Sequence, residues 1–177
     1  MPQGAKISFV ILLTSLFLGG ISAQERSIGA TFSYAGTGLS FQNRVNEDTF
    51  IEIQLRAETA HLFASSAQTP GLTASLTWNM IFAETTSPDG NRISFFAGPG
   101  ICAGLADDVP VHKGIVFGLQ GKVGAECSFK RGIAVSACVS PLLGAHVSMK
   151  DGMPSMLLYK TGLMCSLIPE IGIRYIF

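Results

Sequence analysis

The feature that most constrains this chain is a side-chain pattern that repeats every two residues, and it is clearest at the C-terminus. From Leu163 to Phe177 the odd positions hold Leu, Cys, Pro, Ile, Tyr and Phe. The even positions include Gly162, Ser166 and Gly172 together with the only two charged residues of the segment, Glu170 and Arg174. Successive side chains of a β-strand point to opposite faces of the sheet. The segment is therefore predicted to be a strand with one apolar and one polar face.

The same alternation recurs upstream, and no helical period persists after Gln24. Counting back from the C-terminus, the pattern predicts strands near residues 161–177, 133–147, 115–129, 92–104, 71–84, 49–63 and 38–46. A single-chain barrel in a bacterial membrane normally has an even number of strands. Ser27–Tyr34 is therefore predicted to be the first strand, with a tight turn at Ala35-Gly36-Thr37.

Turn signals separate the predicted strands, and short and long connections alternate. Short turns are predicted at residues 46–48, 87–91 and 130–132, and longer connections at 64–70, 106–114 and 148 to about 158. Membrane-spanning barrels have short turns at one end and longer loops at the other. The predicted fold class is therefore all-β, an eight-stranded antiparallel transmembrane β-barrel with an up-and-down meander topology.

Composition agrees with a barrel whose apolar residues are dispersed. The chain is 47% hydrophobic and 14% charged, whereas a soluble surface alone usually has about 25–35% charged residues. The one long apolar run, Ile7–Gly20, follows Lys6 and precedes small residues that end at Ala23. This three-part order is typical of a signal peptide. We expect residues 1–23 to be removed and residues 24–177 to form the barrel domain.

The polar face of the predicted strands is expected to line the barrel interior. It consists mostly of Gly, Ser, Thr and Ala, which suit the narrow interior of an eight-stranded barrel. Buried charges are tolerated when they are paired and hydrogen-bonded. We therefore predict an internal ion-pair network that closes the lumen, formed by Arg44, Glu52, Arg56, Glu58, Arg92, Lys122, Glu126, Glu170 and Arg174. Glu84 falls on the apolar parity of its strand and is not expected to join them.

Neither a metal site nor a nucleic-acid partner is predicted. The chain has 12 basic and 12 acidic residues, and loss of Lys6 leaves the mature part with one excess negative charge, which argues against a nucleic-acid footprint. Asp107, Asp108 and His112 could bind a cation, but a solvated acidic loop is favoured because hard cations require more oxygen ligands. No cofactor is expected.

The four cysteines are predicted to be free, packed thiols. Cys102, Cys127, Cys138 and Cys165 fall within predicted strands and form no Cys-x-x-Cys motif. Gly98-Pro99-Gly100 lacks the spacing of a nucleotide-binding loop. We interpret its glycines as residues that relieve crowding within a strand.

One pair of residues suggests an enzymatic alternative. His146 and Ser148 lie two residues apart on one face of a predicted strand, and a base beside a hydroxyl nucleophile is the arrangement that hydrolysis requires. Such a pair occurs in outer-membrane lipid A deacylases. Here the pair lies on the predicted lumen face, and no orienting acidic residue is evident, so a non-catalytic pair at a loop margin is favoured.

The C-terminal sequence resembles the last strand of bacterial outer-membrane β-barrel proteins. In that family the chain ends on an aromatic residue after alternating apolar residues, which here are Ile171, Ile173, Tyr175 and Phe177. Together with the signal peptide and the strand count, the mature chain resembles the small OmpA/OmpX-type barrel domain. The resemblance implies recognition by periplasmic chaperones and the barrel-assembly machinery, and contact with outer-membrane lipids and lipopolysaccharide.

The favoured function is that of a non-enzymatic integral outer-membrane protein with a closed polar lumen, acting in envelope integrity or surface interaction. A lipid A-modifying hydrolase and a small-solute pore remain as alternatives.

Overall fold

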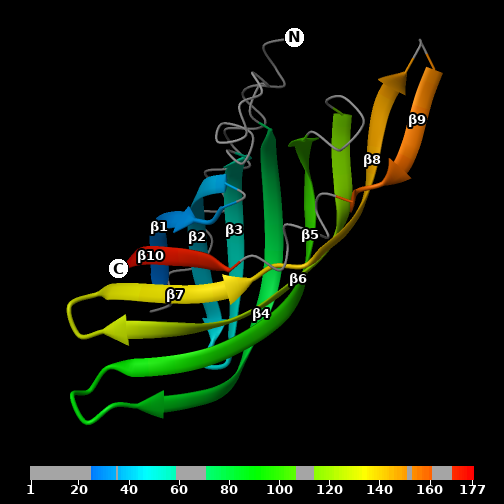
Figure 1. Ribbon diagram of the computed structural model, residues 1–177. Helices are drawn as coiled ribbons and strands as arrows, with labels where there is room; N and C mark the ends of the chain where they lie inside the picture. Colours follow the sequence, from blue (N-terminus) through cyan, green and yellow to red (C-terminus); the bar gives the residue numbers. More distant parts are fainter. Residues whose placement is uncertain (1–24, 35, 59–70, 107–113, 151–152, 161–168) are drawn as a thin grey trace, which may run out of the picture.

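The computed structural model describes residues 25–34, 36–58, 71–106, 114–150, 153–160 and 169–177. These residues form antiparallel strands that close into a barrel (Figure 1). The strands are β1 Arg26–Phe32, β2 Gly36–Asn46, β3 Thr49–Glu58, β4 Leu72–Thr86, β5 Arg92–Ala106, β6 Gly114–Phe129, β7 Ile133–Val139, β8 Leu142–Lys150, β9 Met153–Leu158 and β10 Glu170–Ile176. In the described part of the chain, no helix has the length and apolarity needed to cross a membrane.

The barrel wall has eight strand positions because β7 and β8 are two parts of one strand, and β9 and β10 both lie beside that strand, β9 against β8 and β10 against β7. Val135 lies opposite Cys127 of β6, and Ala145 lies opposite Phe117 of the same strand. The step from 135 to 145 thus matches the step from 127 to 117, so β7 and β8 share one register. The ladder is interrupted at Pro141, which lacks a backbone N–H. The predicted all-β, eight-stranded antiparallel meander is therefore confirmed.

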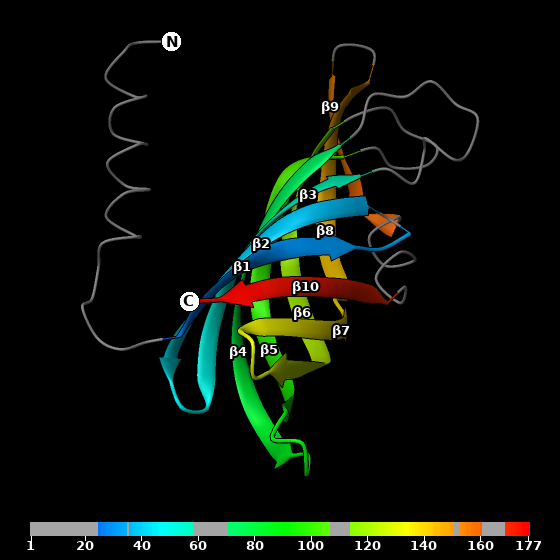
Figure 2. The same ribbon diagram turned by 90° about the vertical axis from the view of Figure 1, so that its left-hand side faces the viewer.

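The barrel closes where the first and last strands pair. Figure 2 shows β2, β1, β10 and β7 side by side across this part of the wall. The pairing continues to the chain end, since the Phe177 N–H donates to the Arg26 carbonyl oxygen at 2.8 Å and the Arg26 N–H donates to the Phe177 oxygen at 3.2 Å.

The register around the closed barrel gives the stagger of its strands. Cross-strand partners starting at Phe117 of β6 lead through Ala103, Ala74, Leu55, Leu39, Ala30, Ile173 and Val135 back to β6 at Cys127. The path thus returns ten residues further along the strand where it began. A closed barrel needs such a stagger, and strand number and stagger together set how much interior remains for side chains.

The three short turns form as predicted. The first joins β2 to β3 after Asn46, the second joins β4 to β5, and the third joins β6 to β7. Gly90 and Gly132 have positive φ angles of 77° and 76° in the second and third turns. Residues other than glycine rarely adopt this backbone conformation.

One prediction about the last part of the chain was wrong, and another can be compared with the structure only in part. The predicted loop from 148 to about 158 contains the end of β8 and all of β9, which pair as a hairpin from Lys150 opposite Met153 to Ala145 opposite Leu158. The missed signal is Asp151-Gly152, a dipeptide typical of two-residue hairpin turns. Within the predicted strand 161–177, residues 161–168 lie outside the described residues, and Glu170–Ile176 forms β10.

A bulge in β4 corrects the orientation predicted for Glu84. The register with β5 shifts between Ile81 and Ala83, and an extra residue in a strand exchanges the faces of all residues beyond it. Ile81 packs against the internal cluster of Phe50, Phe96 and Cys138. The Glu84 carboxylate accepts a hydrogen bond from Ser94 Oγ at 3.2 Å, so it belongs with the polar side chains.

Candidate functional site: the charged lumen

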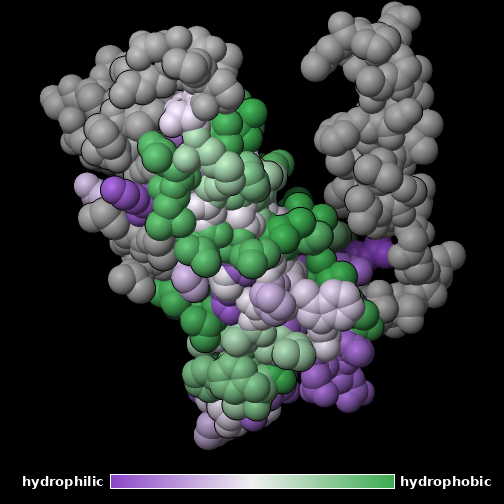
Figure 3. Space-filling model, turned by 90° about the vertical axis from the view of Figure 1, so that its right-hand side faces the viewer, coloured by the Kyte–Doolittle hydropathy of each residue, from purple (hydrophilic) through white to green (hydrophobic). Residues whose placement is uncertain are grey.

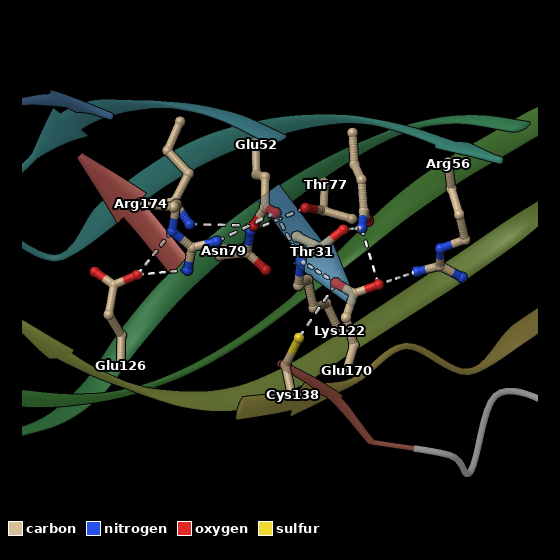
Figure 4. A network of polar contacts seen from close by, with 12 residues as sticks. Thr31, Glu52, Arg56, Thr77, Asn79, Lys122, Glu126, Cys138, Glu170 and Arg174 are labelled. Carbon is tan, nitrogen blue, oxygen red and sulfur yellow. Dashed lines mark hydrogen bonds and ion pairs between the residues drawn. The ribbon is translucent and has the colours of Figure 1, made fainter. Parts of the chain in front are cut away.

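Ion pairs cross the interior of the barrel and join strands that are not neighbours in the wall. They connect β3, β6 and β10, none of which pairs with another of the three. Lys122 Nζ of β6 lies 2.7 Å from Glu52 Oε1 of β3, and Arg56 Nη2 of β3 lies 2.5 Å from Glu170 Oε2 of β10. Side chains can make such contacts only from the inner face of the wall. The charged rows of these strands therefore point inward (Figure 4).

The central part of the network alternates positive and negative groups. Arg174 lies between Glu126, at 2.5 Å from Nη2, and Glu52, at 3.7 Å from Nη1. Lys122 also lies between two carboxylates, since its Nζ is 3.9 Å from Glu170 Oε1. Three carboxylates thus face Arg56, Lys122 and Arg174, and the charges of this group balance. The Lys122, Glu52 and Arg174 side chains are each about 1% exposed.

Neutral side chains donate further hydrogen bonds to two of these carboxylates, Glu52 and Glu170. Gln54 Nε2 donates to Glu170 Oε2 at 2.9 Å and to Thr31 Oγ1 at 2.8 Å. Gln42 Nε2 donates to Glu52 Oε2 at 3.2 Å. Such additional hydrogen bonds are required if a buried ion pair is to offset the cost of removing its charges from water.

A second group of charges lies at the end of the barrel where Arg26 pairs with Phe177. Glu25 Oε2 accepts hydrogen bonds from Arg44 Nη1 at 2.7 Å and from Arg92 Nη2 at 3.0 Å. Glu84 Oε2 lies 3.9 Å from each of the same two arginines. Partial burial raises the pKa of Glu25, but the hydrogen bonds and positive charges of Arg44 and Arg92 outweigh it and leave the pKa below its ordinary value.

The opposite end of the lumen holds Glu58, Tyr159 and His146. Tyr159 donates its hydroxyl hydrogen to Glu58 Oε1 at 3.1 Å, and its ring stacks on His146 with centroids 6.1 Å apart. His146 Nε2 lies 3.1 Å from the Ala106 carbonyl oxygen. Glu58, a predicted member of the network, thus accepts a hydrogen bond from a phenol hydroxyl at this end of the lumen.

The predicted hydrolase pair is not assembled as a nucleophile and base. His146 and Ser148 are both buried, but His146 Nδ1 and Ser148 Oγ each lack a hydrogen-bond partner. The two side chains are thus not bonded to each other. A nucleophile is activated by a base within hydrogen-bond reach, so this geometry does not support the enzymatic alternative.

The remaining predicted sites are placed as follows. Cys102, Cys127 and Cys138 are free thiols, as predicted, and the Cys138 thiol contacts Glu170 Oε1 at 3.8 Å. Cys165 lies outside the described residues, as do Asp107, Asp108 and His112. Within the described ranges no cluster of three or more His, Cys, Asp or Glu side chains could hold a metal ion. Gly98 lies in β5, where a Cβ atom would collide with the carbonyl oxygen of Trp78.

The residues of the predicted assembly signal lie on the outer face of the last strand. Ile171, Ile173 and Tyr175 are more than half exposed on β10. Phe177 follows the strand, and its ring stacks on that of Tyr175 with centroids 6.5 Å apart. Their role in assembly remains a prediction.

Sequence reasoning missed several of the described members of the lumen network, among them Gln42, Gln54, Glu84 and Glu25. Gln42 and Gln54 share the parity of Arg44 and Arg56, so the alternation that identified the charged residues would also have found them. Glu84 was missed because a bulge leaves no clear sequence signal. Glu25 precedes the first predicted strand, where no alternation could orient it.

The sequence matches no protein-family model and no curated protein. Two solved structures are similar to the chain. The N-terminal β-barrel domain of Pseudomonas aeruginosa OprF has 14% identity and a TM-score of 0.46, over 87% of this chain and 96% of that chain. A major outer membrane protein from Thermus thermophilus has 10% identity and a TM-score of 0.48, over 88% of this chain and 100% of that chain. At this level of identity and structural overlap, neither likeness bears on the function of the chain.

Proposed function

We propose that this chain is an integral β-barrel protein of the bacterial outer membrane whose lumen is closed by ion pairs. Its role is to contribute to envelope integrity or to surface interactions, and it neither catalyses a reaction nor passes solutes. Outer-membrane lipids and lipopolysaccharide are its surroundings, and the periplasmic chaperones and barrel-assembly machinery handle it during biogenesis.

The observation that carries this proposal is the inside-out distribution of polarity. Charged side chains bond to one another across the interior, while the large apolar side chains of the same strands lie on the outer surface. Leu39, Leu119 and Phe82 are 64%, 67% and 66% exposed. A soluble protein rarely exposes a large continuous apolar surface. A membrane barrel needs one, because its outer band faces hydrocarbon.

Strand length supports the same proposal. β4 and β5 have 15 residues each and β6 has 16, whereas about 9–11 tilted residues suffice to cross the hydrocarbon core. Every backbone polar group within a bilayer must be satisfied internally. The β1–β10 and β10–β7 pairings, which close the barrel, meet this condition for those strands.

Closure of the lumen is supported by the position of the ion pairs. Glu52, Lys122 and Arg174 bond across the middle of the barrel and are almost fully buried. An ion that crossed the lumen would have to separate these pairs, and breaking a buried pair leaves an uncompensated charge.

Planar-bilayer recording tests the closed lumen. Purified protein inserted into a bilayer is expected to give no steady openings. Steady openings of uniform conductance would instead identify a pore. Extraction of native membranes with urea or carbonate tests the location, because an integral barrel stays in the membrane pellet. Release into the aqueous phase would contradict the proposal.

The same preparation tests for catalysis. Mixed with acyl-labelled lipid A, the protein is expected to release no acyl chain. Acyl release that disappears in His146→Ala would replace the proposal with a lipid hydrolase.

A further inference from the structure

The outer surface of the barrel contains an apolar hollow that the closed lumen does not explain. The hollow has a volume of about 860 Å³ and lies over β3, β4, β5, β6, β8 and β9. One row of large side chains lines it, and each residue of the row is the cross-strand neighbour of the next. In order around the wall, the row is Ile53, Leu76, Ile101, Leu119 and Leu143.

The next row of outward-facing residues supplies the floor of the hollow. Ala145 lies opposite Phe117, Phe117 opposite Ala103, and Ala103 opposite Ala74. Three of these four side chains are single methyl groups, so the surface is low beside the row of Leu and Ile. The hollow is therefore a step in the apolar band, produced by residue size at fixed register positions.

The chemistry of the hollow matches hydrocarbon. Among the described residues that line it, none is charged and Ser75 supplies the only hydroxyl group. Sites for soluble ligands normally add a few convergent polar groups that fix orientation. Figure 3 shows apolar side chains over much of one side of the barrel, with a compact hydrophilic group at the lower right. The hollow is continuous with the apolar band, because Trp78 lies two positions from Leu76 along β4 and is 53% exposed.

We propose that this hollow holds one acyl chain of a membrane lipid in a fixed position. The proposal rests on the proposed function, since it requires the apolar face to lie in a bilayer. Within hydrocarbon the hydrophobic effect gives no preference for a groove over bulk lipid, so packing decides. A chain lying on the alanine floor touches the floor and the Leu and Ile row together, and each close atom pair adds dispersion energy.

The test fills the floor and measures lipid that remains bound. Protein extracted in mild detergent is analysed by native mass spectrometry, and the bound lipid is identified and quantified. Wild-type protein is expected to retain a lipid. Ala103→Leu and Ala74→Leu are expected to lower retention about tenfold, because the larger side chains occupy the space of the acyl chain. The matched control is Ala137→Leu, since Ala137 is also exposed, lies on β7 and is outside the hollow.

Other outcomes would overturn the inference. Equal retention in wild type and both floor variants would show that the hollow binds no chain. A dimer mass that is lost in Ala103→Leu would assign the hollow to a second copy of this chain. Quenching of Trp78 fluorescence by brominated lipids separates the two proposals. If Trp78 is quenched but lipid retention does not differ between the variants, only the proposed acyl-chain site is refuted. If Trp78 is not quenched, the proposed membrane location is refuted as well.

Discussion

At the scale of single residues, Lys122 connects two parts of the lumen network. Its ammonium group approaches Glu52 at 2.7 Å and Glu170 at 3.9 Å, and its side chain is 1% exposed. The arginines that contact Glu25 make similar contacts, but that carboxylate is half exposed. Solvent weakens the second group, because exposed ion pairs contribute about 0–1 kcal/mol.

Lys122→Met is expected to lower the free energy of unfolding by about 3–5 kcal/mol, because removing one partner leaves a buried charge uncompensated. Urea unfolding of the protein refolded into lipid bilayers measures this value. The double variant Glu52→Gln/Lys122→Gln removes both charges and is expected to recover most of the loss. A loss for Lys122→Met below about 1 kcal/mol would place Lys122 among exposed pairs.

The stability of the protein is expected to depend on pH through Glu25. Its pKa is lowered below the ordinary value of 4.5, so its contribution to folding is complete above that value and is lost as pH falls through the lowered pKa. The stability advantage of wild type over Glu25→Gln is therefore expected to shrink below pH 4.5. Urea unfolding at a series of pH values measures it.

The control for Glu25 is Arg44→Gln/Arg92→Gln. Without the two arginines only partial burial acts on the pKa of Glu25 and raises it. Adding Glu25→Gln should then no longer remove a stabilisation that weakens below pH 4.5. A difference between wild type and Glu25→Gln that stays constant from neutral to acid pH would refute the assignment.

At the scale of elements, alternate side chains of β10 lie in two different environments, the lumen and the outer surface. Glu170 and Arg174 are buried in the lumen, whereas Ile171, Ile173 and Tyr175 are exposed. β4 shows the limit of the pattern, since its bulge turns Glu84 inward although simple parity places it outside. The alternation also did not predict that β9 and β10, which lie beside the same strand of the wall, pair with it in different registers.

Arginine substitutions along β10 are expected to cost more near the middle of the strand than at its end. Ile173→Arg should lower the free energy of unfolding in bilayers by about 2–4 kcal/mol, because the charge meets hydrocarbon near the midplane. Tyr175→Arg is the matched variant near the strand end, and its expected cost is about 0–1 kcal/mol. Equal costs at both positions would argue against a lipid-facing β10.

At the scale of the whole molecule, the barrel places Trp78 outside and the phenylalanine pair Phe50 and Phe96 inside. Trp78 is 53% exposed on β4, and Phe96 is 1% exposed, with its ring packed edge-on against Phe50. A tryptophan at position 78 or at position 96 would therefore show by its fluorescence whether the outer surface of the barrel faces lipid.

Brominated acyl chains are expected to quench the fluorescence of Trp78 strongly when the protein is reconstituted in bilayers. Quenching requires close contact between the indole ring and the lipid chains, which the outward position allows. The control is Trp78→Phe combined with Phe96→Trp, which moves the single tryptophan into the lumen and should show little quenching. Comparable quenching at both positions would contradict the proposed orientation.

The alternation of side chains was enough to predict most strands, the short turns and the inward parity of the nine charged residues, because a two-residue period maps directly onto the two faces of a strand. Tertiary structure decided what this period cannot encode. The bulge at Ile81 and Ala83 reversed Glu84, and the β8–β9 hairpin replaced a predicted loop. Partners such as Lys122 with Glu52 and Arg56 with Glu170 depend on which strands face each other across the lumen. Barrel closure and stagger set these distances, and both are properties of the whole sheet and not of any one segment.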